Sequence, residues 1–345
     1  MPNIRVFWNG LKIAFLIMGT TIGAGFASGR ELWEFFASYG SSSSMYVVLS
    51  ILLFSISCYI ILTISQRIQA HNYTYVLKEL VGSKLGKMYD FFILIYLLST
   101  TVIMFAGSGA ALQYWSIPYW AGVAILGVCV LLAFIKGFEG VISLNSILIP
   151  VLIMTLIAVC LMFIEAGYGE KTDVLSEQNI LSSAITFTAF NILPLIAILS
   201  VVGRSLKPVE IKVASVACAI GLCAVAVLYN ETLLRISSDI MFYEVPLYAI
   251  LRYFSVELTL LVSFVLWLAI YTTAISGVFG IISRAEKLYL PKWLLAGGLM
   301  LLIIPMTRFG FSNLVKLLYP LYGVLNLFIL AMILLYPLAK REKMR

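Results

Sequence analysis

The sequence predicts an all-α membrane protein with ten transmembrane helices in a 5+5 inverted repeat, in which helices 1 and 6 are interrupted. Composition, the length of the apolar runs and two matching interruptions support this prediction. Hydrophobic residues make up 62% of the 345 residues, charged residues 11%, and the mean hydropathy is +1.05. Soluble domains contain about 45–50% apolar and about 25% charged residues. Such a chain needs lipid around it, and its long unbroken runs favour helices over the alternating strands of a barrel.

The apolar runs follow one another with short connections. A spanning helix takes about 20 residues, so a chain of this length provides for about ten spans. In order they cover residues 10–38, 45–65, 88–114, 117–135, 141–164, 181–203, 211–234, 256–283, 292–307 and 312–337. No low-complexity linker separates them, so we expect one transmembrane transporter domain over residues 1–345.

The basic residues are distributed in a way that predicts topology. The net charge is +7, and Lys and Arg collect in loops 66–87, 204–212 and 284–292 and in the tail 340–345, whereas the loops between them are neutral or acidic. Cytoplasmic loops carry the excess of Lys and Arg, so an even number of spans places both termini in the cytoplasm. Because these residues are spread over separate segments, we expect no nucleic-acid partner.

Enzyme and cofactor signatures are missing from the sequence. It has no phosphate-binding Gly-Lys-Ser/Thr loop and no cluster at metal-ligand spacing. The single histidine, His71, falls in a polar loop, so the spans offer no histidine-based nucleophile–base pair. The cysteines lie inside apolar runs as small packing residues: Cys58, Cys129, Cys160, Cys218 and Cys223. We therefore expect neither an enzyme nor an organic cofactor.

The first span contains a glycine cluster that predicts a break in the helix. It reads Gly19-Thr-Thr-Ile-Gly23-Ala-Gly25-Phe-Ala-Ser-Gly29. Close helix packing is the alternative explanation of such glycines. A break frees peptide groups, which is tolerated only where the backbone is buried in protein or lines a cavity. Carbonyls near Gly19 and Ile22 suit a hard cation such as sodium, and N–H groups beyond Ala27 suit a carboxylate.

The sixth span has a second candidate interruption, Thr188-Ala-Phe-Asn191-Ile-Leu-Pro194. Five spans precede the sixth and five begin with it. Since five is odd, two like halves insert with opposite orientation, and interrupted spans at matching positions of such halves mark the binding site of a transporter. We expect a first repeat at about 8–164 and a second at about 181–337. A simple proline kink is the alternative.

The eighth span carries adjacent hydroxyl groups, Thr272 and Thr273, deep in an apolar run. Such hydroxyls commonly bond back to a carbonyl one turn earlier. Facing a broken first span, however, they would complete an oxygen site for a cation. The sequence thus leaves both interpretations open.

The order of elements and the Gly19–Gly25 break resemble the amino acid–polyamine–cation (APC) superfamily with its leucine-transporter-like fold, and Gly25-Phe-Ala-Ser-Gly29-Arg30-Glu31 resembles the bacterial YkvI-type membrane proteins. This resemblance implies a bacterial plasma-membrane location. It also implies a sodium site with carbonyl or hydroxyl ligands from spans one and eight: Gly19, Ile22, Ala269, Thr272 and Thr273. In proton-driven members of this superfamily a lysine of the fifth span can take the place of the sodium. The fifth span here (141–164) has no lysine, which favours sodium coupling.

The resemblance also implies an inner gate in which an arginine ahead of span one pairs with an acid at the end of span eight, over a tryptophan. The matching residues are Arg5, Trp8 and Glu286, although Lys287 occupies the alternative acid position. Plain positive-inside anchoring is the alternative role of Arg5.

Ionisable and aromatic side chains within the spans provide further candidates. Intramembrane charges default to functional roles. Arg30, Glu31 and Lys316 are candidates for an outer gate, and Glu31 is also a candidate for contacting an amine or carrying a proton. The expected solute-binding residues are Thr21, Gly23, Ala24, Gly25, Ser28, Glu31, Tyr96, Ser99, Phe187, Phe190 and Asn191. For the aromatic members, packing is the alternative.

Together these features predict a secondary transporter of a small polar organic solute, an amino acid or related zwitterion, coupled to sodium by alternating access. The alternatives are a proton-coupled transporter using Glu31, and a non-transporting solute sensor of the same fold. A channel is disfavoured because the sequence offers no filter segment. The expected partners are the solute and the lipid bilayer, and the sequence carries no prediction of an oligomeric state.

Overall fold

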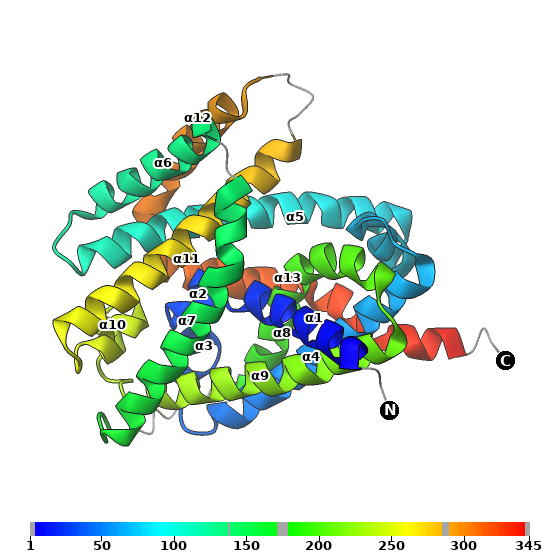
Figure 1. Cartoon of the computed structure of the whole chain (residues 1–345), viewed down its shortest axis with the longest axis horizontal. Helices are drawn as coiled ribbons and strands as arrows, with labels where there is room; N and C mark the ends of the chain where they lie inside the picture. The colour runs from blue at the N-terminus through cyan, green and yellow to red at the C-terminus, as the bar shows by residue number, and fades with distance from the viewer. Residues whose placement is uncertain (1–3, 137–138, 171–178, 285–289, 342–345) are drawn as a thin grey trace.

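A computed structural model describes residues 4–136, 139–170, 179–284 and 290–341, and the regular elements in these ranges are helices (Figure 1). Eight described helices are long and apolar enough to cross a membrane, and α6 (Tyr119–Lys136) adds a shorter apolar one. The eight are α4 (Ser43–Ile68), α5 (Tyr73–Gln113), α7 (Glu139–Glu165), α8 (Ile180–Val202), α9 (Pro208–Leu234), α11 (Val256–Ile282), α12 (Lys292–Ile303, continued by a 3-10 turn over Ile304–Phe309) and α13 (Phe311–Arg341). The chain is an all-α, multi-pass membrane protein.

The N-terminal segment is broken twice, into α1 (Ile4–Thr21), α2 (Ala24–Ala27) and α3 (Arg30–Phe35). At the first break Gly23 is extended, with φ −88° and ψ −172°. At the second, Gly29 has φ 81°, a region that glycine adopts far more readily than other residues. A Cβ on Gly29 would also lie 2.7 Å from the hydroxyl of Tyr229 on α9. The predicted interruption of the first span is confirmed, and a second turn follows it.

The predicted interruption of the sixth span is wrong, because α8 runs unbroken from Ile180 to Val202. Its polar side chains bond to carbonyls and leave the helix intact: Asn191 Nδ2 donates to Phe187 O (3.1 Å), and Thr188 Oγ1 is 3.1 Å from Ala184 O. Pro194 lies inside the helix and has no N–H to donate to the carbonyl of Phe190. The proline-kink alternative therefore describes α8 better than an unwound segment.

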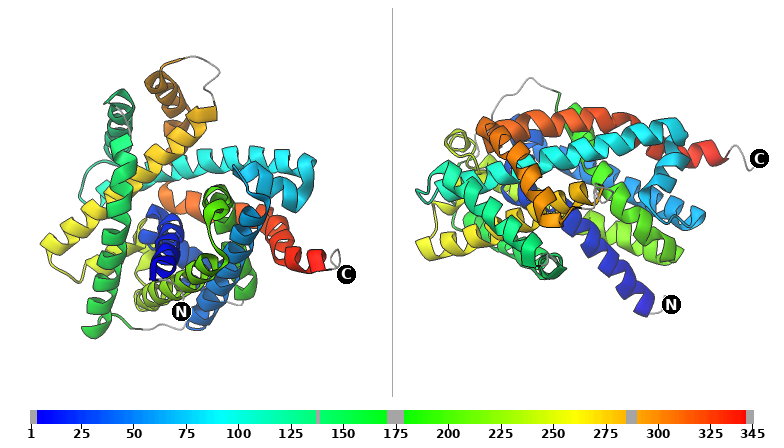
Figure 2. Two further views of the ribbon diagram at one scale, coloured as in Figure 1. Left: turned by 45° about the vertical axis from the view of Figure 1, so that its right-hand side comes forward. Right: turned by 90° about the horizontal axis from the view of Figure 1, so that it is seen from above.

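The helices divide into two packed groups, and α13 and α7 (the latter through α9 and α11) each contact both of them. In one group α1 packs on α9, and α4 packs on both α8 and α9; in the other, α5 packs on α6 and α11, and α12 packs on α6. Helix α13 contacts α8 of the first group and α5 of the second, and Figure 2 shows it running beside α5. The start of α1 and the end of α13 both lie toward the right-hand side of Figure 1. The broken N-terminal segment thus lies where the two groups meet.

A short helix, α10 (Pro246–Leu251), supports the break from the α9–α11 connection. The backbone N–H of Leu247 donates to Ser28 O at 2.9 Å, and the Tyr229 hydroxyl donates to Ala27 O at 3.0 Å. These two bonds satisfy carbonyls that the turn at Gly29 withdraws from a regular helix. The second break is therefore held by α9 and α10.

Candidate functional site

A cavity of about 580 Å³ lies beside the first break, with walls from the N-terminal segment, α5, α8, α11 and α13. Most of the predicted solute-binding residues border it, together with one residue of the predicted sodium site. The residues shared by prediction and cavity are Thr21, Gly23, Ala24, Gly25, Glu31, Tyr96, Phe190, Asn191 and Thr273. The fold thus gathers five segments of the chain around one space.

A carboxyl group and three aromatic rings form one end of the cavity. Glu31 is only 6% exposed, and its Oε1 lies so close to Gly25 that a Cβ there would collide with it. The same Cβ would lie 2.9 Å from the Tyr319 hydroxyl. The rings of Phe190 and Tyr319 stack with centroids 4.3 Å apart, and the Tyr96 ring is 5.9 Å from that of Phe190. Gly25 is therefore required as a residue without a side chain.

Peptide groups of the first break border the same cavity. Helix α1 ends at Thr21 and α2 begins at Ala24, so the last carbonyls of α1 and the first N–H groups of α2 have no partner within their own helices. Thr21, Gly23, Ala24 and Gly25 all line the cavity. The break therefore offers main-chain donors and acceptors to a solute.

Three predicted solute-binding residues lie away from the cavity lining. Ser28 donates to the carbonyl three residues earlier (2.6 Å) and accepts from the first N–H of α3 (3.2 Å). The hydroxyls of Ser99 and Tyr322 are 2.6 Å apart, which directs Ser99 to α13. Phe187 packs edge-on against Phe35, with centroids 5.3 Å apart. The contacts of these three residues are structural. The Ser28 hydroxyl accepts the first N–H of α3, a donor that the sequence analysis assigns to the carboxylate of a solute.

The predicted sodium ligands on α11 are grouped together. The hydroxyls of Thr272 and Thr273 are 3.2 and 2.7 Å from Ala269 O, which is the back-bonded arrangement that the sequence left open. On α1, Gly19 packs against α7, and Ile22 is fully buried. Within the described ranges no three His, Cys, Asp or Glu side chains group as metal ligands. The oxygen atoms of α11 and of the break fit a hard cation better than a transition metal.

A second recess, of about 780 Å³, lies on the other side of α3 and α13. Arg30, Glu34 and Lys316 line it, whereas Glu31 and Tyr319 line the first cavity. Arg30 Nη2 and Glu34 Oε1 form an ion pair at 2.7 Å. As adjacency on a helix requires, Arg30 and Glu31 point to different spaces.

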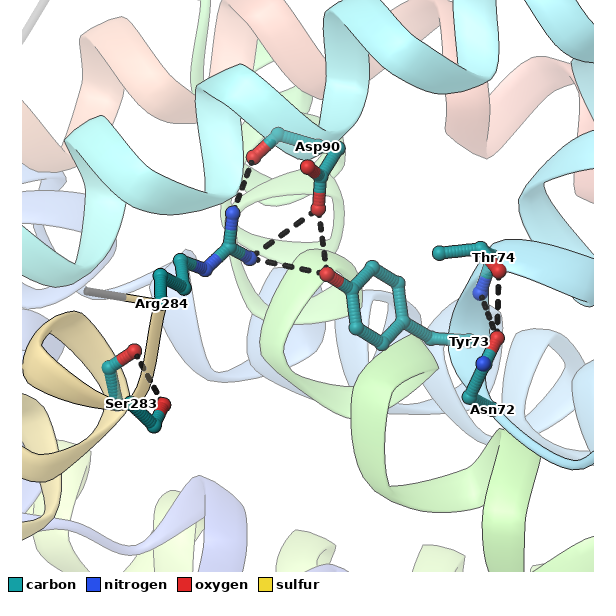
Figure 3. Close-up of polar contacts among 7 residues, drawn as sticks. Asn72, Tyr73, Thr74, Asp90, Ser283 and Arg284 are labelled. Carbon is teal, nitrogen blue, oxygen red and sulfur yellow. Dashed lines mark hydrogen bonds and ion pairs between the residues drawn. The ribbon is translucent and has the colours of Figure 1, made fainter. Parts of the chain in front are cut away.

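The first cavity is also bordered by Tyr73, Ser283 and Arg284, whose polar contacts are drawn in Figure 3. Arg284, just beyond α11, pairs with Asp90 of α5 at 3.2 Å and donates to the Tyr73 hydroxyl at 2.9 Å. That hydroxyl in turn donates to Asp90 Oδ1. We call these three residues the mouth cluster: Tyr73, Asp90 and Arg284. Sequence reasoning missed it, because Asp90 stands at a span end and Arg284 was counted only among the basic loop residues.

The predicted inner gate is not assembled by the described residues. Arg5 and Trp8 are exposed, Trp8 by 59%, and Glu286 lies outside the described residues. Arg5 instead lines a small recess of about 490 Å³ together with Lys207 and Glu210 of the α8–α9 region. Glu210 is buried and caps α9 by accepting a bond from the Lys207 N–H.

Two Bacillus subtilis proteins resemble the chain along almost its whole length. The uncharacterised protein YyaD is 40% identical over 336 residues, which cover 97% of this chain and 98% of YyaD. The uncharacterised membrane protein YkvI is 25% identical over 325 residues, which cover 92% of each chain. The chain belongs to the same family as YyaD, and its similarity to YkvI confirms the resemblance that its sequence motifs indicate. A family model described as "Spore germination protein" also matches residues 9–175 of the chain.

Solved transporter structures share the fold of this chain. An inward-facing conformation of Mhp1 superposes with a TM-score of 0.65 at 12% identity, covering 94% of this chain and 75% of that one. MhsT in complex with L-phenylalanine gives 0.64 at 16% identity, covering 94% and 88%. A closed conformation of Mhp1 gives 0.53 at 15% identity, covering 96% and 75%. The fold is that of leucine-transporter-like carriers, and these neighbours are transporters, not enzymes.

Proposed function

We propose that this protein is a secondary active transporter that moves a small polar organic solute, an amino acid or related zwitterion, with sodium by alternating access. The observation that carries the proposal is the cavity beside the Gly23 break, which joins freed peptide groups, a buried carboxyl and aromatic rings in one space. Irregular backbone at membrane depth is tolerated where it lines a cavity, and in carriers it forms the binding site.

In the membrane we propose ten spans in two inverted halves of five, with the first span formed by α1–α3 and both termini in the cytoplasm of a bacterial cell. The eight long helices, α6 and the broken N-terminal segment supply these spans. The basic loops support the orientation, because cytoplasmic loops carry the excess of Lys and Arg.

We infer an inward-facing state from the position of the mouth cluster. Tyr73 and Arg284 lie in the basic segments 66–87 and 284–292, and they border the cavity together with Ser283. Helices α3 and α13 separate the cavity from the second recess. The higher TM-score to the inward-facing than to the closed form of Mhp1 supports the same state.

For coupling, sodium is proposed to bind carbonyls of Gly19, Ile22 and Ala269 and the hydroxyls of Thr272 and Thr273. Thr273 and the break border one cavity, so cation and solute would lie close together. A cation shifts access only if it binds one state more tightly than the other.

Two other functions have specific support. The match to the family model described as "Spore germination protein" favours a solute sensor that transports nothing. The buried carboxyl in the cavity favours proton coupling through Glu31. Uptake by proteoliposomes decides among them. Full-length protein is given radiolabelled amino acids under separately imposed sodium and pH gradients.

We expect accumulation of one solute under the sodium gradient and its loss when an ionophore collapses that gradient. Accumulation under the pH gradient alone would instead establish proton coupling. Saturable binding without accumulation under either gradient would establish a sensor and end the transport proposal.

A further inference from the structure

The charged side chain beside the aromatic rings of the cavity, which we call its deep end, is an acid, Glu31. Among the described residues that line it, the charged ones are Glu31 and Arg284. Arg284 lies at the mouth and is paired with Asp90, while the neighbouring Arg30 faces the second recess and pairs with Glu34. The deep end therefore presents a carboxyl group without a basic side chain in the cavity lining around it.

A carboxylate in an apolar site is costly unless a positive charge or hydrogen bonds compensate it. The Tyr319 hydroxyl hydrogen-bonds to the Glu31 carboxyl. This hydroxyl is polar but carries no charge that would balance a carboxylate. A ligand cation at this place would supply the missing charge. The site thus favours a ligand with a positive group over one with a negative group.

The rings beside Glu31 suit the same ligand. Tyr96, Phe190 and Tyr319 border the cavity there, with Phe190 stacked on Tyr319 and tilted against Tyr96. Ring faces attract a desolvated organic cation, and they also bury its apolar carbons. Leu193, Met104 and other apolar side chains extend this surface away from the carboxyl.

We propose that Glu31, with the rings of Tyr96, Phe190 and Tyr319, is an ammonium subsite, and that the solute is an organic amine whose apolar body lies along the rings. This inference rests on the proposed function, and it specifies the end of the solute that is indispensable: the ammonium group is required, whereas a carboxylate on the same molecule is not.

The test uses three probes of one shape: phenethylamine as the cation, 2-phenylethanol as its neutral analogue and hydrocinnamate as the anion. Binding to the purified full-length protein is measured by calorimetry and by the rise in unfolding temperature, since a ligand of the native state stabilises it. We expect phenethylamine to bind at least tenfold more tightly than either analogue.

In the variant Glu31→Gln, which keeps the shape and removes the charge, we expect phenethylamine affinity to fall at least tenfold to the level of 2-phenylethanol. Glu34→Gln is the matched control, because Glu34 lies on the same short helix but borders the other recess, and it should bind phenethylamine like the wild type. Tyr96→Leu, which keeps the carboxyl, should weaken binding about threefold to tenfold.

The inference is overturned if phenethylamine does not bind the wild type, if hydrocinnamate binds as tightly, or if Glu31→Gln leaves the affinity unchanged. Failure of the transport proposal looks different. In that case phenethylamine binds and discriminates the Glu31 variant, yet proteoliposomes accumulate no solute under either gradient.

Discussion

At the scale of single residues, the cavity depends on the missing side chain of Gly25. The Glu31 carboxyl and the Tyr319 hydroxyl occupy the space into which a Cβ would project. Gly25, Glu31 and Tyr319 come from α2, α3 and α13, so a change at Gly25 disturbs the contact among three elements.

Replacing Gly25 by Ala should therefore lower solute binding sharply and destabilise the protein by about 1–3 kcal/mol, the usual cost of overpacking. Thermal unfolding and ligand binding of the purified variant measure both effects. Gly298→Ala on α12 is the control, because nothing lies within 4 Å of its Cβ, and it should unfold like the wild type. Equal behaviour of the two variants would contradict the packing seen around Gly25.

A second residue prediction concerns the hydroxyl groups of α11. Thr272→Val removes an oxygen from the proposed cation site and keeps the shape of the side chain, so the sodium concentration needed for half-maximal uptake should rise at least tenfold. Thr155→Val on α7 removes a hydroxyl that bonds back to Val151 O in the same way and should leave it unchanged. If Thr272→Val responds to sodium like the wild type, the site assignment is wrong.

At the scale of elements, the turn between α2 and α3 is fixed from outside. Gly29 provides the positive φ, and Tyr229 of α9 closes over it while donating to Ala27 O. An alanine at Gly29 would be destabilised both by backbone strain and by a collision with the Tyr229 hydroxyl. Removing that hydroxyl separates the energy of the collision from the energy of the strain.

Gly29→Ala should destabilise the protein by about 2–4 kcal/mol, of which about 1–2 kcal/mol is the cost of the left-handed backbone. Combining it with Tyr229→Phe, which removes the colliding hydroxyl, should recover at least about 0.5 kcal/mol relative to the sum of the single changes. Unfolding of the four proteins gives this coupling directly. Strict additivity would show that Tyr229 does not close over the turn.

The elements differ in how well the sequence predicted them. The break at Gly23 was predictable, because several glycines in one apolar run leave few alternatives to unwinding or close packing. Thr188, Asn191 and Pro194 gave a similar local signal in α8, but the Thr188 and Asn191 side chains bond within the helix, Thr188 also bonds to α4, and no unwinding results. The mouth cluster had no local signal, since Tyr73, Asp90 and Arg284 meet only through the packing of α5 and α11.

At the scale of the whole molecule, two groups of helices meet at the broken segment, and two recesses lie on opposite sides of α3 and α13. Alternating access requires that one of them open as the other closes. The recesses differ in their lining, so their exposure to each side of the membrane is measurable.

In membrane vesicles, Ser283→Cys at the cavity mouth should react with an impermeant maleimide from the cytoplasmic side, and Ser38→Cys in the second recess should react from the opposite side. Adding sodium and solute together should slow the labelling at Ser283→Cys at least threefold, because the cavity then closes inward. Reaction of Ser283→Cys from outside would contradict the proposed orientation. A protein whose endogenous cysteines are replaced by Ala provides the background.

Arg30 and Glu31 are consecutive residues, yet each belongs to a different compartment of the molecule. An α-helix turns by about 100° per residue, so the boundary between these compartments is crossed within a single peptide step of α3. Opposite charges on one helix therefore point away from each other into separate compartments. Helix α3 is thus a wall that the two compartments share, and a rotation of this one helix would change the charge exposed in both.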